Sequence, residues 1–162
     1  MRRRTSPQPQ EAALSVGYLM GRARASLLSA LDVELAPFAL SSMQFAVLKH
    51  LADGAAQTAA DLCRLMHYDT GSMTRILDRL QERGLLRRER SRADRRVVAL
   101  RLDRAGRALL PRLRAVAAGV LEGHLAGFSA AEVASLKAYL VRMIDNGQGA
   151  GDNVGIRTDS RA

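Results

Sequence analysis

The chain has 162 residues and a formal net charge of +9; 48% of its residues are apolar but only 4% are aromatic. This length suffices for one domain with a hydrophobic core. The low aromatic content, with no Trp, favours packed helices over a β-sandwich. The single cysteine, Cys63, excludes an internal disulfide.

The beginning of the chain superficially resembles a signal peptide, because MRRR is followed by AALSVGYLMG. That apolar stretch is short, is interrupted by Ser15 and Gly17, and continues directly into Arg22 and Arg24. We therefore expect a helix that stays in the protein. No run of about 18 apolar residues is present, so the sequence predicts a soluble, cytoplasmic protein without a membrane partner.

The first predicted elements are an arm and three helices. Residues 1–10 are basic and contain proline, which is typical of a disordered arm. Residues 11–36 carry leucines at helical spacing and precede a proline, so we expect one helix there. The capping box Ser41–Gln44 predicts a helix that ends at Asp53-Gly54, and the capping box Thr58–Asp61 predicts a short third helix.

The run YDTGSMTRILDRLQER at residues 68–83 predicts an amphipathic helix ended by Gly84. Its apolar residues recur at i, i+3, i+4 and i+7, namely Met73, Ile76, Leu77 and Leu80. The unpaired N–H groups of such a helix start can bind an anion. A nucleotide site would need a preceding strand and a glycine-rich loop, with a lysine in the P-loop case. A helix precedes this one and no lysine is near, so we interpret the anion as a DNA phosphate.

The second half of the chain begins with a hairpin. LLRRER and VVALRL are short β-type runs separated by the polar SRADRR, which predicts two strands with an arginine-rich tip. Asp103 then begins a long helix to about Leu125, and a capping box at Ser129–Glu132 opens a last helix to about Ile144. Residues 146–162 contain four glycines without periodicity, and we expect a disordered tail there.

This order of elements predicts a mainly α fold with a small β-hairpin wing, that is, a winged helix-turn-helix flanked by dimerisation helices. We assign residues 37–102 to the DNA-binding region, 11–36 to an N-terminal dimerisation helix and 103–145 to C-terminal dimerisation helices. A compact winged helix does not need these flanking helices for its own core. A homodimer would bury them and would place two recognition helices about 34 Å apart. A monomer with a helical cap is the alternative.

In such a fold the first residues of the second helix read base edges in the major groove. Small polar side chains suit either donors or acceptors, and glycine permits close approach of the backbone. The predicted contacts of this recognition helix are Thr70, Gly71, Ser72, Thr74, Arg75 and Arg79. The alternative is an ordinary N-cap followed by a solvated helix face.

Positive charge gathers around the predicted hairpin. From Arg83 to Arg107 there are ten arginines and three acidic residues, a local net charge of +7. A cluster of one sign beside a helix-turn-helix is typical of a phosphate-binding surface. Arg92, Arg95 and Arg96 at the tip are placed to enter the minor groove, and we include Arg90 among the wing contacts.

Catalytic and metal-site patterns are weak in this sequence. His50, His67 and His124 are scattered, without an HExxH or a Ser-His-Asp spacing, so we predict no enzyme, no cofactor and no metal site. Cys63 and His67 are four residues apart and could place two ligands on one helix face. A redox- or metal-responsive regulator acting through this pair is the alternative function. A partner-binding helical protein with incidental charge is a third.

The stretch TAADLCRLMHYDTGSMTRILDRLQERGLLRRERSRADRRVVALRLDRAGRALL resembles the MarR family of transcriptional regulators. Its most specific pieces are LDRLQERGLLRR, Asp94-Arg95-Arg96 and the LxxxGRxLL that opens the next helix, and the resemblance covers about residues 11–145. It implies a homodimer formed by the first and last two helices, with Asp94 and Arg96 supporting the wing and DNA contact. Asp103 stands where the family usually has Thr. Cys63 does not correspond to the reactive cysteine of peroxide-sensing members.

The resemblance also implies a small aromatic effector bound between the dimerisation helices and the DNA-binding region. An aromatic carboxylate needs an apolar slot and one cation. The candidate lining residues are Tyr18, Arg22, Met43 and Phe45, with ordinary packing as the alternative for each. The predicted function is thus a homodimeric repressor of a palindromic double-stranded DNA operator, released by a small aromatic or phenolic effector.

Overall fold

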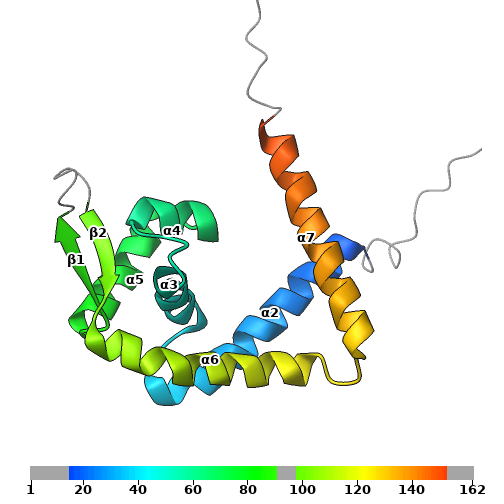
Figure 1. Cartoon of the computed structure of the whole chain (residues 1–162), viewed down its shortest axis with the longest axis horizontal. Helices are drawn as coiled ribbons and strands as arrows, with labels where there is room; N and C mark the ends of the chain where they lie inside the picture. Colours follow the sequence, from blue (N-terminus) through cyan, green and yellow to red (C-terminus); the bar gives the residue numbers. More distant parts are fainter. Residues whose placement is uncertain (1–14, 91–97, 153–162) are drawn as a thin grey trace, which may run out of the picture. The chain divides into compact units, whose positions relative to one another are not determined.

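The computed structural model describes residues 15–90 and 98–152 (Figure 1). Its elements are α2 (Val16–Leu35), the 3-10 turn η1 (Ala36–Phe38), α3 (Ser42–Ala52), α4 (Ala59–Met66), α5 (Thr70–Glu82), β1 (Leu86–Arg90), β2 (Val98–Leu102), α6 (Arg104–His124) and α7 (Ala130–Asp152). The predicted fold class, mainly α with a small antiparallel hairpin, is confirmed. Contacts divide the chain into two compact units, residues 1–122 and 123–162.

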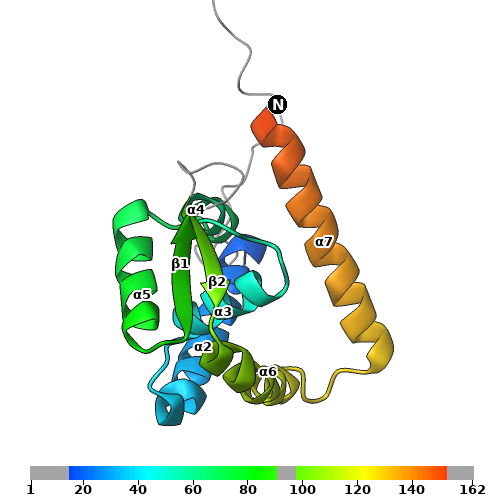
Figure 2. The ribbon, with the colours of Figure 1, turned by 60° about the vertical axis from the view of Figure 1, so that its left-hand side comes forward.

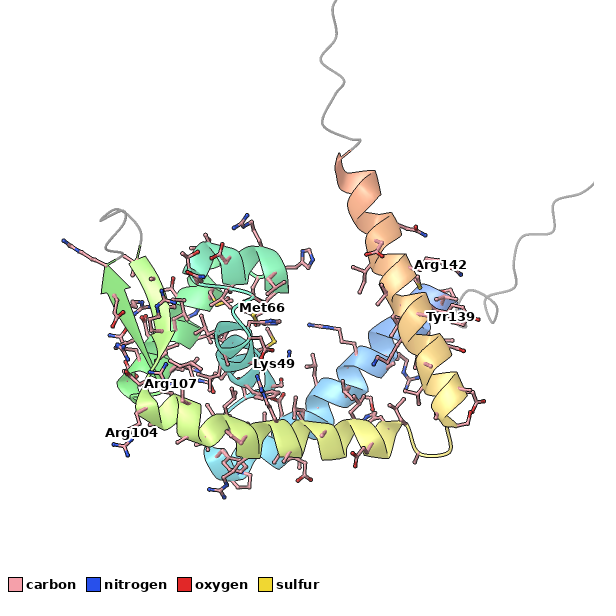
Figure 3. The ribbon with its side chains drawn as sticks, in the orientation of Figure 1. Lys49, Met66, Arg104, Arg107, Tyr139 and Arg142 are labelled. Carbon is pink, nitrogen blue, oxygen red and sulfur yellow. The ribbon has the colours of Figure 1, made fainter. Side chains whose placement is uncertain are left out.

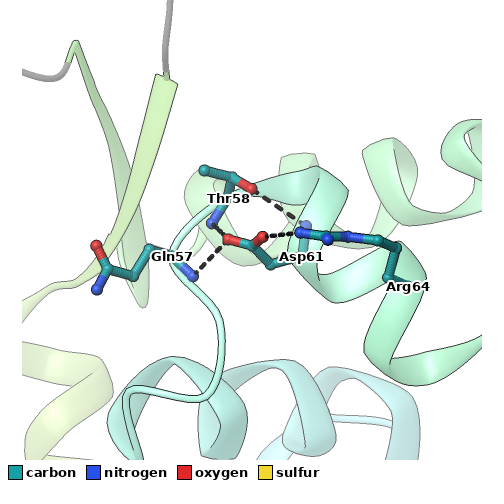
Figure 4. Close-up of polar contacts among 4 residues, drawn as sticks. All are labelled: Gln57, Thr58, Asp61 and Arg64. Carbon is teal, nitrogen blue, oxygen red and sulfur yellow. Dashed lines mark hydrogen bonds and ion pairs between the residues drawn. The ribbon is translucent and has the colours of Figure 1, made fainter. Parts of the chain in front are cut away.

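Side chains in the first turn set where the short helices begin. Ser41 and Gln44 form the predicted capping box of α3. At α4, Thr58 Oγ1 accepts from the Asp61 backbone N–H, 3.1 Å away, and the Asp61 carboxylate accepts from the backbone N–H groups of Gln57 and Thr58 (Figure 4). The Thr58 side chain and the Gln57 N–H lower the pKa of Asp61, so the ionised carboxylate holds this helix start.

The core of the first unit is built mainly from leucines. In α5, Met73, Leu77 and Leu80 are fully buried and Ile76 is partly buried against them, which confirms the predicted apolar stripe. The core also takes in two side chains from α2, Leu31 and Leu35, and two from α6, Leu110 and Leu113.

This differs from the expectation that the winged helix does not need residues 11–36 and 103–145 for its own core. The C-terminal end of α2 and the first half of α6 supply buried leucines to the winged helix. A three-helix unit with a two-stranded sheet has little apolar surface of its own to bury, so the flanking helices complete its core.

The hairpin is antiparallel, with Leu86 opposite Leu102 and Arg90 opposite Val98. Leu86 and Leu100 are buried, and β1 lies along α5 (Figure 2). The backbone N–H of Leu100 donates to the Gln57 carbonyl at 2.8 Å, which ties the hairpin to the loop between α3 and α4. The predicted tip, residues 91–97, lies outside the described residues.

The second unit consists mainly of α7. Its helix start has the predicted capping box, because the Ser129 N–H donates to the Glu132 carboxylate at 2.8 Å and Ser129 Oγ accepts from the Glu132 N–H. The helix continues to Asp152, so residues 146–152 are helical and do not belong to a disordered tail as predicted. The predicted arm, residues 1–10, lies outside the described part of the chain. No single described helix has the length and hydropathy of a membrane span.

Candidate nucleic-acid interface

The start of α5 is capped by its own carboxylate. Asp69 Oδ1 accepts from the Ser72 backbone N–H at 2.8 Å. The pKa of Asp69 is lowered by this backbone bond, by a further bond from the Ser72 side chain, and by the charge of Arg75. One of the helix-start donors that we assigned to a DNA phosphate, the Ser72 N–H, is therefore already bonded to the carboxylate of Asp69.

The predicted recognition residues lie on the side of α5 that turns away from the core. Ser72 is half-buried and the other five, Thr70, Gly71, Thr74, Arg75 and Arg79, are exposed. Because the apolar stripe anchors the opposite side of the helix, this face is a fixed surface that a duplex can approach.

Two of these hydroxyl groups bond within the helix itself. Thr74 Oγ1 donates to the Thr70 carbonyl at 2.8 Å. Ser72 Oγ accepts from Arg75 Nη2 at 3.1 Å. The exposed face of α5 is thus organised by hydrogen bonds within the helix.

Several arginines of the predicted phosphate-binding cluster have structural partners. Arg87 pairs with Glu89 and with Asp103, each at 2.6 Å. These two hydrogen-bonded carboxylates raise the pKa of Arg87. Arg88 pairs with Asp78 of α5 at 2.7 Å, and so joins the hairpin to the recognition helix. The local charge counted along the sequence therefore overstates the positive charge that is free to meet DNA.

Arg83 also has a structural role, since its guanidinium donates to the carbonyls of Phe38 and Ala39. Within the described residues no ion pair involves Arg90, Arg101, Arg104 or Arg107, which are all exposed. Arg104 and Arg107 project from the first turn of α6 (Figure 3). The remaining predicted wing residues, Arg92, Asp94, Arg95 and Arg96, lie outside the described part of the chain.

A cavity of about 680 Å³ lies within the first unit. It is bounded by α2, α3 and the segment that leads into the recognition helix. Its lining residues are Arg24, Leu28, Ser42, Met43, Ala46, His50, Leu65, Met66, His67 and Tyr68. The cavity combines one cation, several apolar side chains and a tyrosine, the chemistry that an aromatic carboxylate requires.

Only one of the four predicted effector residues lines this cavity, namely Met43. Phe45 is buried in the core with 6% of its surface exposed. Tyr18 and Arg22 are exposed on α2, where the guanidinium lies 6.0 Å from the ring centroid. The cation of the cavity is instead Arg24. Helical spacing could have identified it, because Arg24 and Leu28 lie at i and i+4 on one face.

His50 is the side chain of the cavity whose pKa is clearly shifted. Partial burial lowers the pKa of His50, and the neighbouring charge of Lys49 lowers it further, while Asp53 acts in the opposite direction. The imidazole is therefore neutral at neutral pH, with its ring available to donate or accept a hydrogen bond.

Cys63 and His67 belong to the end of α4. Cys63 is half-buried and packs against the core, and its carbonyl accepts from the Tyr68 N–H at 3.0 Å. His67 is the C-cap residue, with a positive φ of 51°. The part of the chain that the structure describes has no group of three or more His, Cys, Asp or Glu side chains able to hold a metal ion.

Comparisons of the sequence and of the structure with known proteins find the same family. The MarR family profile matches residues 40–97. The multiple antibiotic resistance protein MarR of Escherichia coli is 30% identical over 115 residues, which cover 70% of this chain and 79% of that protein. A mutant of that protein complexed with operator DNA superposes with a TM-score of 0.73 at 25% identity, over 85% of this chain and 99% of the other.

A second similar structure is that of BpsR from Bordetella bronchiseptica, described as regulated in its DNA binding by 6-hydroxynicotinic acid. It superposes with a TM-score of 0.74 at 27% identity, over 86% of this chain and 98% of the other. None of these names describes an enzyme.

Proposed function

The chain belongs to the MarR family of DNA-binding transcriptional regulators, and from this premise we propose that it is a homodimeric repressor of a palindromic operator, released by a small aromatic or phenolic acid. The observation that carries the proposal is the exposed face of α5, where small polar and basic residues are backed by a fully buried stripe. The exposed arginines around the hairpin that form no ion pair within the described residues supply contacts to phosphate.

A homodimer is supported by apolar side chains that water would otherwise surround. On α7, Tyr139, Val141 and Ile144 are each more than half exposed, at 57%, 56% and 58%. Tyr139 projects from the helix with the guanidinium of Arg142 5.6 Å from its ring centroid (Figure 3). On α2, Val16 is 62% exposed. Large apolar side chains left exposed on a helix are typical of an interface between subunits, and a two-fold dimer pairs two recognition helices with two half-sites.

Release of DNA by an aromatic acid is supported by the position of the cavity in the fold. Leu65, Met66, His67 and Tyr68 line it, and Asp69 and α5 follow directly in the chain. A ligand that prefers one position of this segment therefore changes the position of the recognition helix. Such a ligand weakens DNA binding only if it binds the DNA-free arrangement more tightly.

The proposal is tested by selecting bound duplexes from a random pool and measuring their affinity by fluorescence anisotropy at increasing salt. We expect an enriched inverted repeat, binding by a dimer, and affinity that falls steeply with salt. Adding 6-hydroxynicotinate or salicylate should release the selected duplex. A protein that shows no salt-sensitive DNA binding even at low ionic strength would contradict the assignment.

A further inference from the structure

Ser72 lies in the middle of a hydrogen-bonded chain at the start of the recognition helix. Its backbone N–H donates to the Asp69 carboxylate at 2.8 Å. Its hydroxyl oxygen accepts from Arg75 Nη2 at 3.1 Å. Ser72 therefore links the capping carboxylate of the helix to the guanidinium of Arg75.

The consequence for Arg75 is a defined orientation. One of its five N–H donors bonds to Ser72, and the Asp69 carboxylate behind Ser72 attracts its charge. The remaining donors stay on the exposed face of the helix. A planar guanidinium held in this way presents two parallel donors, the pattern that matches O6 and N7 of guanine.

Thr74 presents a methyl group and not a hydroxyl. Its Oγ1 donates to the Thr70 carbonyl one turn earlier, at 2.8 Å, so the hydroxyl proton is committed to the helix backbone. The residue is exposed, and the methyl is the part of the side chain left to contact a base. In the major groove the partner of a methyl group is the C5-methyl of thymine.

We propose that each recognition helix reads a guanine through Arg75, which Ser72 positions, and the methyl group of a thymine through Thr74. This inference rests on the proposed function and defines the operator that the helix selects. Because the two reading residues are neighbours on one helix, the guanine and the thymine belong to two different base pairs that lie close together in each half-site. Ser72 is the positioning residue, because its hydroxyl holds the guanidinium of Arg75.

The thymine contact is tested in the selected duplex by replacing each thymine in turn with deoxyuridine, which removes only the methyl group. At one position per half-site, this replacement should weaken binding of the unaltered protein about fourfold, which is the effect expected from the loss of one buried methyl group. Thr74→Val keeps the methyl and should keep this preference. Thr74→Ser keeps the hydroxyl but removes the methyl, so it should lose the preference for thymine over deoxyuridine. The reverse result, with preference kept by Thr74→Ser and lost by Thr74→Val, would overturn the inference.

The guanine contact is tested with 7-deazaguanine, which lacks the N7 acceptor. We expect one guanine per half-site at which this replacement weakens binding about fivefold or more. Ser72→Ala should reduce that ratio while binding to random DNA and the melting temperature stay close to those of the unaltered protein. Ser72→Thr, which restores a hydroxyl, should restore the ratio. An unchanged ratio in Ser72→Ala would show that Ser72 does not position Arg75.

The results separate this inference from the proposed function. A protein that binds no DNA refutes both. A protein that binds an enriched operator, but with no sensitive thymine and no sensitive guanine, remains a regulator and refutes the reading by Thr74 and Arg75. Salt-sensitive binding without any enriched sequence refutes both the specific operator and the reading by Thr74 and Arg75, because it shows phosphate contacts without base readout.

Discussion

The backbone carbonyl of Leu85 occupies the space next to Gly106 where a side chain would have to begin. A Cβ on Gly106 would lie 2.1 Å from that oxygen, far inside van der Waals contact. The same carbonyl accepts from the Asp103 N–H at 3.0 Å. The first turn of α6 is thus packed against the residue that joins the recognition helix to the hairpin, and position 106 requires glycine for this approach.

Gly106→Ala should therefore destabilise the protein. The added methyl meets backbone that cannot turn aside, so α6 has to shift, at a cost of about 1–3 kcal/mol. Gly119→Ala is the matched control, since it lies in the same helix and its Cβ would meet nothing within 4 Å; there we expect a stability equal to or above that of the unaltered protein. Urea unfolding followed by circular dichroism measures both. Equal stability of the two variants would contradict the close packing.

Substitution of a second glycine, Gly71, should affect DNA binding without lowering stability. A Cβ on Gly71 would meet only the Asp69 carboxylate, at 3.4 Å, which is ordinary contact. Gly71→Ala should leave the melting temperature unchanged or raised, because alanine favours the helix. It should nevertheless weaken operator binding if the backbone of α5 approaches the duplex as closely as predicted. Anisotropy titrations beside a thermal melt give the answer, and full operator affinity would place Gly71 away from DNA.

The arginines divide into two groups with different expected effects. Arg90 and Arg95 are predicted to contact phosphate, so Arg90→Ala and Arg95→Ala should weaken binding to operator and random DNA alike. Each lost contact should reduce the slope of log affinity against log salt by about 0.9. Arg88→Ala is the control: Arg88 is paired with Asp78, so its loss should change the salt slope less. A larger change of the salt slope for Arg88→Ala than for Arg90→Ala or Arg95→Ala would contradict this division.

Local features of the sequence predicted local structure well. The capping boxes at Ser41, Thr58 and Ser129 and the stripe through Met73 involve residues at most a few positions apart, and the structure confirms them. Helix starts depend on side chains of the first turn, which can be read directly from spacing.

Contacts between distant segments were not predictable in this way. Arg83 bonds to carbonyls 44 and 45 positions away in the chain, and the sequence shows only an exposed cation. The cavity residue is Arg24 and not Arg22, because its position depends on how α2 is rotated against α3. A charge count along the chain treats every arginine alike, whereas folding pairs some of them with carboxylates.

The pH dependence of effector binding provides a test of the cavity through His50. Partial burial, and then the charge of Lys49, lowers the pKa of this imidazole. Because the pKa is lowered in the folded state, this histidine favours folding above its ordinary pKa and disfavours it as the pH falls. A carboxylate bound beside Arg24 adds a negative charge to the cavity, which raises the pKa again. Ligand binding should therefore be accompanied by proton uptake at His50.

We expect affinity for 6-hydroxynicotinate or salicylate to increase as the pH is lowered from about 8 to about 6, a range in which the carboxylate stays ionised while imidazole titrates. His50→Gln should remove this increase, and isothermal titration calorimetry in buffers of different ionisation enthalpy should show the loss of proton uptake. His67→Gln tests whether the second imidazole of the cavity contributes, and Arg24→Leu should abolish binding at every pH. Proton uptake that persists in His50→Gln would assign the titration to another group and leave His50 without a part in effector binding.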